Sequence, residues 1–357
     1  MAQDVTGVFI PLARYQLGMK KVLVTGGAGF IGSHTVVELE AGGYTPIILD
    51  NFSNSDERII DGLSNILGHA PTLIKGDCTD LDTLRKVFRE HGPFFGVIHF
   101  AAYKAVGESV REPLKYYHNN LRSTESLLQV MGEEQCTRLV FSSSCTVYGQ
   151  PDHLPVTEST PFQRASSPYG YTKQVCERMI LDTSSAPDSK LASTLLRYFN
   201  PIGAHPSAEI GELPLGTPEN LIPYITQTAA GLRPEVTVFG TNYSTPDGTC
   251  IRDYIHVVDL AAAHVAALNY LDTAKPGCEA VNLGTGNGNS VKEVIDTFIE
   301  TTGVDLPHRF GERRPGDVEQ IFASAEKAEK LFQWKTEKRL EDALRDAWKW
   351  QQKLGQE

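Results

Sequence analysis

The sequence predicts an α/β protein whose first part is a doubly wound parallel sheet and whose second part is a smaller α/β domain. Three observations lead to this prediction. Short, β-branched apolar runs alternate with amphipathic helical stretches over residues 19–199. A glycine-rich turn separates the first run from the first helical stretch, and an aspartate ends the second run. Strands that alternate with helices favour a parallel sheet covered on both faces.

The predicted elements follow one another in a regular order. Residues 21–25 (KVLVT) are short and rich in β-branched side chains, which suits a strand buried on both faces. A helix is expected over 30–41, and a second strand (PIILD) ends at Asp50. Further strands are expected at 72–77, 96–102, 138–144 and 191–199, with helices at 80–91, 114–131 and 171–182. Right-handed crossovers then place the ligand crevice at the carboxyl ends of the strands.

The composition changes after residue 199. Residues 200–250 are rich in Pro, Gly, Asn and Thr, periodic signals resume at 251–271 and 280–302, and 340–354 is typical of an amphipathic helix. We therefore expect one domain at 19–199 and a second at 200–357, with part of 251–272 packing back on the first. Residues 1–18 are expected to be a disordered leader, and they are a poor fit to a signal peptide because no cationic region precedes their apolar patch.

The composition excludes several classes of function. The 357 residues carry 33 Lys and Arg against 44 Asp and Glu, so the net charge of −11 gives no general attraction for nucleic acid. No apolar run reaches the roughly 18 residues that a membrane span needs. The six cysteines form no CxxC pair and, with the histidines, show no metal-ligand spacing. Free thiols in a reducing, cytoplasmic compartment and the absence of a metal site are the expectation.

The glycine-rich turn is TGGAGFIG, residues 25–32. Gly26, Gly27, Gly29 and Gly32 satisfy both GxGxxG and GxxGxxG between the first strand and the first helix. Glycines let the backbone approach a pyrophosphate, which then faces the positive end of the helix. Asp50, at the end of the second strand, can accept hydrogen bonds from ribose hydroxyls and would repel a 2′-phosphate, so NAD is favoured over NADP. The alternative is an ordinary glycine turn followed by an ordinary aspartate.

A second constellation is SSSCTVYG followed by SPYGYTK. Tyr169 and Lys173 are four residues apart and share one face of a helix, and Ser144 ends the fifth strand. A lysine ammonium favours the phenolate, so the pKa of Tyr169 is expected to lie below 10. Such a tyrosine can take a proton from a hydroxyl and return it. A YxxxK pair alone is usually an exposed tyrosine and a solvated lysine, but the dinucleotide site and the serine run favour catalysis.

Together these motifs resemble the extended short-chain dehydrogenase/reductase family and, within it, the UDP-glucose 4-epimerases. The same is true of LDNFSNS, HFAAYKAVGES, YYHNN, LRYFNPIGAHPS, DGTCIRDYIHVVDL, NLGTGNGNSV and RRPGD, which follow in order from Met19 nearly to the end. The resemblance implies a Rossmann-type NAD domain, a UDP-sugar domain and a homodimer formed by helices of the NAD domain. It also implies a place in galactose metabolism.

The resemblance implies a role for individual residues. Tyr169 matches the catalytic tyrosine, Lys173 its partner and Ser144 the hydroxyl that positions the sugar. Besides Gly32, Tyr169 and Lys173, the positions that match NAD-binding ones are Gly26, Gly29, Phe30, Ile31, Asp50, Asn51, Asp77, Cys78, Phe100, Ala101, Lys104, Asn119 and Tyr198. The positions that match UDP-sugar-binding ones are Ser144, Asn200, Asn220, Leu221, Phe239, Arg252, Tyr254, Arg314 and Asp317. Guanidinium groups suit a pyrophosphate, and a phenyl ring offers a flat face to uracil.

Two positions refine the implied activity. Cys145 and Thr146 stand where sugar-nucleotide dehydratases of this family carry an Asp-Glu pair, so dehydration is not expected. Ile321 stands where the family places a size gate beside the sugar's 2-substituent, and its intermediate size leaves N-acetylated UDP-sugars open. The implied reaction is the interconversion of UDP-galactose and UDP-glucose through a 4-keto sugar, with tightly held NAD. The alternatives are a UDP-GlcNAc/UDP-GalNAc or other nucleotide-sugar epimerase, a net NAD-dependent dehydrogenase and a non-catalytic NAD-dependent regulator.

Overall fold

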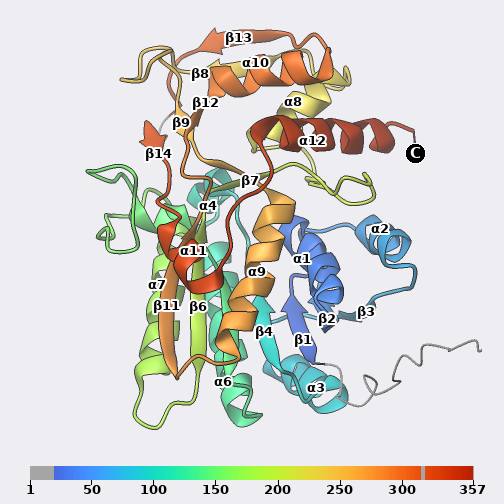
Figure 1. Cartoon of the computed structure of the whole chain (residues 1–357), viewed down its shortest axis with the longest axis vertical. Coiled ribbons are helices and arrows are strands. Elements are labelled where there is room, and N and C mark those ends of the chain that lie inside the picture. The colour runs from blue at the N-terminus through green and yellow to red at the C-terminus, as the bar shows by residue number, and fades with distance from the viewer. Residues whose placement is uncertain (1–19, 315–317, 357) are drawn as a thin grey trace, which may run out of the picture.

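The computed structural model describes residues 20–314 and 318–356. Seven strands form one parallel sheet in the order β11-β6-β5-β4-β1-β2-β3 (Figure 1). They are β1 (Lys21–Thr25), β2 (Thr45–Asp50), β3 (Thr72–Lys75), β4 (Gly96–His99), β5 (Arg138–Ser144), β6 (Ala192–Tyr198) and β11 (Gly277–Leu283). The order reverses between β1 and β4, so the predicted doubly wound parallel sheet is confirmed.

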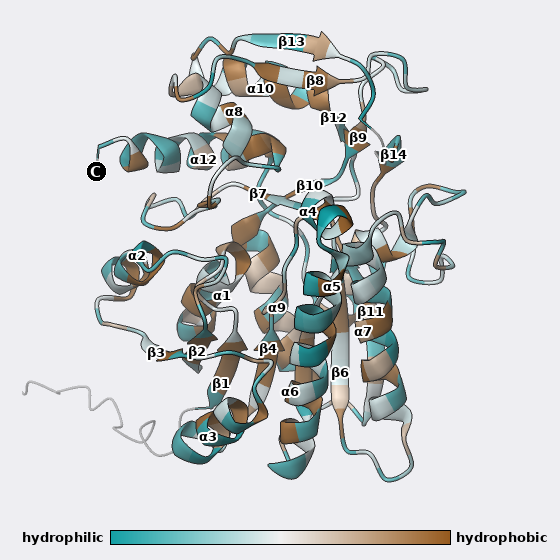
Figure 2. Ribbon diagram, turned by 180° about the vertical axis from the view of Figure 1, so that it is seen from behind, coloured by the Kyte–Doolittle hydropathy of each residue, from teal (hydrophilic) through white to brown (hydrophobic). Residues whose placement is uncertain are grey.

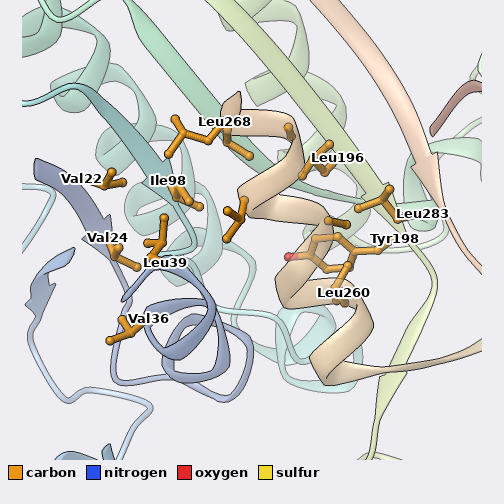
Figure 3. Packing of buried hydrophobic residues seen from close by; sticks show 14 of the residues in the cluster. Val22, Val24, Val36, Leu39, Ile98, Leu196, Tyr198, Leu260, Leu268 and Leu283 are labelled. Carbon is orange, nitrogen blue, oxygen red and sulfur yellow. The ribbon is translucent and has the colours of Figure 1, made fainter. Parts of the chain in front are cut away.

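Helices cover both faces of this sheet. One face packs against α1 (Phe30–Ala41), α2 (Arg58–Leu67) and α9 (Val257–Leu271), and Figure 3 shows this apolar layer. The other face packs against α3 (Leu81–His91), α6 (Arg122–Glu133) and α7 (Pro168–Ser185). Within β1, Val22 and Val24 face the first layer and Leu23 faces the second. Both sides of the strand are therefore apolar, which explains its unbroken hydrophobic run.

A smaller body lies beyond the carboxyl ends of the sheet (Figure 1). Its own core joins α8, α10, α12 and the β8–β13 pair. The elements of this body and its junction are β7 (Asn200–Ile202), α8 (Leu221–Ala229), β8 (Val236–Phe239), β9 (Ile251–Arg252), β10 (Tyr254–His256), β12 (Asn289–Ser290), α10 (Val291–Thr302), β13 (His308–Gly311), β14 (Gln320–Ile321) and α12 (Leu340–Leu354). Helix α11 (Glu326–Phe332) packs instead on α9 and on β11 of the large sheet.

The chain returns to the large sheet after entering the smaller body. Helix α9 packs on α1, β5 and β6, and β11 then pairs with β6 as the edge strand. The returning segment thus extends beyond 251–272 to include 277–283. The division into domains at 19–199 and 200–357 stays a prediction, and the leader proposed at 1–18 lies outside the described residues.

Several boundaries differ from those expected. Strands β3 and β4 end at Lys75 and His99, and Gly76 and Phe100 each make one more backbone hydrogen bond, to Asp50 and Thr25, before the chain leaves the sheet. The expected helix at 114–131 is divided into α5 (Pro113–Tyr116), a π-helical turn η1 (Tyr117–Leu121) and α6. Helix α2 and the short α4 (Val106–Arg111) were not expected.

The outer surface of α6 is mostly polar. Figure 2 shows mostly hydrophilic residues on the side of α6 that faces the viewer. Among the described residues, no helix combines the length and the apolar character needed to traverse a bilayer.

Candidate active site

The carboxyl ends of six strands meet at one edge of the large sheet and bring the predicted site residues to it. Gly26 follows β1, Asp50 ends β2, Phe100 follows β4, Ser144 ends β5 and Tyr198 ends β6. The third strand contributes the loop that begins after Lys75. This edge faces the smaller body (Figure 1), and in open α/β sheets ligands bind at the carboxyl ends of the strands.

The glycine turn leaves no room for a side chain at Gly26 or Gly32. Gly26 has φ +71°, and a Cβ there would lie 2.8 Å from the backbone nitrogen of Ala101. A Cβ at Gly32 would lie 2.3 Å from the carbonyl oxygen of Gly26. Gly29 caps α1 without any side-chain acceptor, and the first turn of α1 has no acidic residue. The N-terminal amides of α1 are therefore suited to an external anion such as a pyrophosphate.

Asp50 is buried beside this turn, and its carboxylate already accepts three hydrogen bonds from the protein. The amide of Ala28 donates to Oδ2 (3.0 Å), and the amide of Phe52 and the hydroxyl of Ser55 donate to Oδ1 (2.9 Å each). Two carboxylate oxygens can accept about four hydrogen bonds. The side chain is thus held rigidly while it keeps acceptor capacity for a ribose hydroxyl.

The loop after β3 extends this polar edge. Asn51 donates to Oδ2 of Asp77 (3.0 Å), and Thr79 donates to Oδ1 from its amide and its hydroxyl (2.7 Å each). Burial alone would raise the pKa of Asp77, but the hydrogen bonds from Thr79 and Asn51 outweigh it and leave that pKa below its ordinary value. Burial raises the pKa of the neighbouring Cys78 thiol, so this group is a neutral wall and not a nucleophile.

The remaining predicted NAD positions differ in what their side chains do. Lys104 pairs with Glu212 (Nζ–Oε1 3.0 Å) and lies over the ring of Phe30. Asn119 donates to Asn120 (3.0 Å) within the π turn. The side chain of Tyr198 is turned into the core, where its hydroxyl bonds Ser142 and its ring packs beside His264.

The serine run and helix α7 build the centre of the site. Lys173 Nζ donates to the carbonyl oxygen of Ser142 (2.6 Å), and its ammonium lies 6.0 Å from the ring centroid of Tyr169. Ser144 accepts from the amide of Thr146 (3.2 Å) and hydrogen-bonds Tyr169. The structure places Tyr169, Lys173 and Ser144 near one another, because α7 lies against β5 with Tyr169 and Lys173 on its inner face, and their catalytic roles stay a prediction.

The expectation of a lowered tyrosine pKa is not met by the protein alone. Burial raises the pKa of Tyr169 to about 12, and the hydrogen bond from Ser144 opposes this only in part. Burial also lowers the pKa of Lys173 to about 8. Desolvation of both groups therefore outweighs the attraction between ammonium and phenolate, and a further positive charge is needed to ionise Tyr169 near neutral pH.

The predicted UDP-sugar residues lie on the smaller body and its junction. Asn200, Arg252 and Tyr254 lie on β7, β9 and β10, and Asn220 and Leu221 lie at the start of α8. The guanidinium of Arg314 lies 5.6 Å from the half-exposed ring of Phe239. Asp317 lies outside the described residues.

Sequence reasoning missed two residues that line this region. Phe199, next to Tyr198, packs with Cys145, Tyr148 and the predicted gate Ile321 in a small buried cluster. Strand alternation was the available signal, because consecutive residues face opposite sides. Glu212 receives hydrogen bonds from both Lys104 and Asn220 (2.6 Å for Asn220), and no local pattern marked it.

Comparisons with known proteins agree with this geometry. Residues 22–284 match the model of the NAD dependent epimerase/dehydratase family. UDP-glucose 4-epimerase 2 of Arabidopsis thaliana is 50% identical over 334 residues, which cover 93% of this chain and 95% of the relative. A UDP-glucose-4-epimerase from Stenotrophomonas maltophila, crystallised with NAD and formylated UDP-arabinopyranose, superposes with a TM-score of 0.91 at 47% identity (94% and 99% covered). One from Bifidobacterium longum, crystallised with NAD+ and UDP, gives 0.89 at 46% identity (94% and 98% covered).

Proposed function

This chain belongs to the NAD dependent epimerase/dehydratase family, and we propose that it interconverts UDP-galactose and UDP-glucose by epimerisation at carbon 4 of the hexose. The observation that carries the proposal is the grouping of Tyr169, Lys173 and Ser144 beside a glycine turn that suits a dinucleotide. The enzyme is an isomerase that uses NAD, and its reaction has no net change of redox state.

The residues present fit NAD. The turn has no room for a side chain at Gly26 or Gly32, the N-cap of α1 has no side-chain acceptor, and Asp50 has an acceptor position left. We assign the pyrophosphate to the turn and an adenosine ribose hydroxyl to Asp50. When bound, NAD takes up and returns the hydrogen of carbon 4 with its electron pair, and its oxidised nicotinamide brings a positive charge.

Proton transfer falls to the chain's own groups. The phenolic oxygen of Tyr169 takes the proton from the sugar's 4-hydroxyl and later returns it to the 4-keto sugar on the other face. Ser144 orients that hydroxyl, and Lys173 holds a positive charge near the phenolic oxygen. Because burial alone raises the pKa of Tyr169 to about 12, the second positive charge supplied with the oxidised cofactor is what favours the phenolate.

Inversion requires that the hexose present both faces to the same groups. The nucleotide is therefore assigned to the smaller body, where Arg252, Arg314 and Phe239 lie, and the hexose to the space near Tyr169. A site that holds the nucleotide firmly and the hexose loosely allows the keto sugar to turn between the two transfers.

The test is an assay of the purified protein with UDP-galactose and no added NAD. We expect UDP-glucose to form, which requires both epimerisation and retained NAD. Parallel reactions with UDP-GalNAc test whether Ile321 leaves room for an acetamido group. If neither substrate reacts even after NAD is supplied, or if NADH accumulates free in solution, the epimerase proposal fails and a net redox reaction replaces it.

We further propose a homodimer in the cytoplasm, acting in galactose metabolism. The support for a dimer is a group of exposed apolar side chains on the adjoining elements α4, α5 and α7, namely Val106, Val110, Leu114, Tyr171 and Leu181. The support for a reducing compartment is that all six cysteines are free thiols and five of them are buried.

The dimer proposal has a matched control. Leu114 is 79% exposed on the proposed face, and Leu232 is 68% exposed in the smaller body. We expect Leu114→Glu to give a monomer in sedimentation velocity, because a charge in the centre of an apolar interface is desolvated without a partner. Leu232→Glu is expected to leave the dimer intact. Equal behaviour of both variants would contradict this choice of face.

A further inference from the structure

Helix α7 carries a third charged group on the face that bears Tyr169 and Lys173. Glu177 follows Lys173 by four residues, so the three side chains lie in one stripe along the helix. All three are buried. The first two are accounted for by proton transfer, whereas Glu177 has no part in the chemistry described so far.

The partners of Glu177 tie α7 to two strands. Arg197 of β6 donates hydrogen bonds to both oxygens of the carboxylate (Nη2–Oε2 2.6 Å, Nε–Oε1 2.9 Å). Ser143 of β5 donates its hydroxyl to Oε1. Arg197 in turn donates to the hydroxyl of Tyr148 (3.1 Å), in the turn that follows Ser144. One carboxylate therefore joins the helix of Tyr169 and Lys173 to the strand of Ser144.

Burial makes this ion pair a poor source of stability. The side chains of Glu177 and Arg197 are only 4% and 7% exposed. Desolvation of two charges offsets most of their attraction, and apolar residues of similar volume often stabilise a fold as well or better. A pair retained in such a place is better explained by what it holds in position.

Each of the three serines of the run contacts a different residue of the stripe on α7. The carbonyl of Ser142 accepts from Lys173, the hydroxyl of Ser143 donates to Glu177, and the hydroxyl of Ser144 bonds Tyr169. Each residue of the stripe on α7 therefore contacts a different serine of the last three positions of β5. A shift of the helix along the strand would break all three contacts together.

We propose that Glu177, held by Arg197 and Ser143, is a positioning residue of the reaction, which fixes the register of α7 against β5 and so sets the place of Lys173 and Tyr169. The proposal rests on the proposed epimerase function, because the effect on Lys173 and Tyr169 is read through proton transfer. Glu177 itself does not touch the reacting atoms.

Glu177 also contributes to the charge of the site. Three titratable groups interact electrostatically with Lys173: Cys176 and Glu177 on its own helix, and His99 on β4. Near them, Tyr169 and Tyr198 interact with each other. The negative charge of Glu177 opposes the lowering of the pKa of Lys173 by burial. Without it, Arg197 would stand as an unpaired positive charge and lower that pKa further.

The test compares variants of the NAD-loaded enzyme with UDP-galactose as substrate. We expect Glu177→Gln to lower kcat per folded site about 10- to 100-fold with KM little changed, since small misplacements of catalytic groups have effects of that size. The alkaline limb of its kcat–pH profile should move to lower pH than in the wild type. In Glu177→Gln/Arg197→Gln the net charge is restored, so the limb should return towards the wild-type position while kcat stays low.

Controls separate positioning from stability. Arg178→Gln removes an exposed ion pair with Asp182 on the same helix, and it should change neither kcat nor the alkaline limb. Ser143→Ala keeps both charges and should still lower kcat about threefold or more, which covers the case in which Glu177→Gln does not fold. Hydrogen exchange of the α7 amides, read without turnover, should be faster in Glu177→Gln than in Arg178→Gln.

The outcomes are distinguishable. An inactive wild type would refute the epimerase function. Hydrogen exchange of the α7 amides would still show whether Glu177, through Arg197 and Ser143, holds the helix against β5. An active wild type whose Glu177→Gln variant loses only thermal stability, with kcat per folded site and the alkaline limb unchanged, would overturn the proposal. So would a Ser143→Ala variant with wild-type kcat.

Discussion

At the scale of single residues, the ionisation of the Tyr169 phenol is opposed by its burial. Burial raises its pKa to about 12, and the interaction with Ser144 acts in the opposite direction only in part. The balance in the protein alone keeps the proton on the oxygen at neutral pH. The site is thus arranged so that proton transfer becomes favourable only when a further positive charge is present.

Removal of this hydroxyl gives the first prediction. Tyr169→Phe should lower kcat for UDP-galactose about 100- to 10,000-fold, the usual contribution of a positioned acid–base group. Thermal stability should change little, because the ring stays buried. Wild-type turnover in this variant would contradict the assignment.

The ionisation of Tyr169 can be followed directly. In the NAD-loaded protein, the tyrosinate absorbance that disappears in Tyr169→Phe should titrate at lower pH than in the ligand-free protein, where burial holds the pKa at about 12. The difference spectrum of the two proteins, with and without NAD, measures this. Equal titration in both states would exclude a role of cofactor charge.

Ile321 is the residue predicted to act as a size gate beside the sugar's 2-substituent. Its side chain is buried with Phe199, Cys145 and Tyr148, where packing is close. A change in its volume therefore changes the space left for a group packed against it. We expect Ile321→Gly to raise the ratio of kcat/KM for UDP-GalNAc to that for UDP-galactose, and Ile321→Tyr to lower it. Assays of both substrates on the two variants measure the ratio, and an unchanged ratio in both would place the gate elsewhere.

Some residues of the site could be predicted and others could not. Tyr169, Lys173 and Ser144 carry a local spacing, four along a helix or the last position of a strand, and the structure brings them together. Glu177 has the same spacing, but its partner Arg197 lies on another strand, so no local pattern shows the pair. The pKa of Tyr169 was predicted in the wrong direction, because desolvation depends on packing that a sequence does not display.

At the scale of elements, the junction of β1 and α1 shows how closely backbone can approach backbone. Gly26 and Gly32 are each restricted to glycine for a different reason. Gly26 has a left-handed φ, whereas Gly32 faces the carbonyl of Gly26 across a gap that no Cβ fits. Gly29 has an ordinary φ of −74° and a wider gap of 3.2 Å.

This contrast gives a prediction with an internal control. Gly32→Ala should lower the thermal midpoint of the ligand-free protein, because its Cβ would lie 2.3 Å from backbone that cannot move without opening the turn. Gly29→Ala should have a much smaller effect. Calorimetry of both variants without NAD tests the packing alone, and similar losses in the two would contradict it.

The boundaries of elements were the hardest part to predict. The apolar pattern over 114–131 continues through three helical segments, because a π turn inserts extra backbone without changing which side faces the core. In that turn, Asn120 turns inward and bonds the backbone of Tyr103 and the hydroxyl of Thr172. These partners are distant in sequence, so the need for the turn could not be seen in the segment itself.

At the scale of the whole molecule, the fold contains neutral histidines in places that water does not reach. Burial lowers the pKa of His34 and His99 to about 3 and that of His264 to about 4. In the unfolded chain these groups titrate near 6.5. Below pH 6.5 the unfolded state therefore binds protons that the folded state does not, and stability falls as the pH falls.

The expected result is a lower free energy of unfolding at pH 5.5 than at pH 7.5, measured with urea at both values. Each such group contributes up to about 1.4 kcal/mol per pH unit within its window. His264→Phe should reduce this dependence, because the ring lies between Phe100 and Tyr198 and a phenyl group fits there without titrating. An unchanged dependence in the variant would exclude His264 as a contributor.

The large sheet was the most predictable feature of the molecule. Six of its strands follow from alternating apolar runs, and the seventh, β11, was not recognised as a member because it lies beyond the smaller body in the sequence. Its sequence, GCEAVNL, is only partly apolar and only its last three residues are buried, as suits an edge strand. Only the pairing with β6, across a long excursion of the chain, assigns it to this sheet.

That excursion has a consequence for synthesis on the ribosome. Six strands are complete when Tyr198 emerges, but α9 and β11, which cover α1 and the edge of β6, follow only after much of the smaller body. At roughly 5–20 residues per second this delay lasts several seconds. During it the nascent sheet presents an apolar face and an open edge to the solvent. We expect chaperone binding to concentrate in that interval, and slow codons placed within it to lengthen the time of greatest risk.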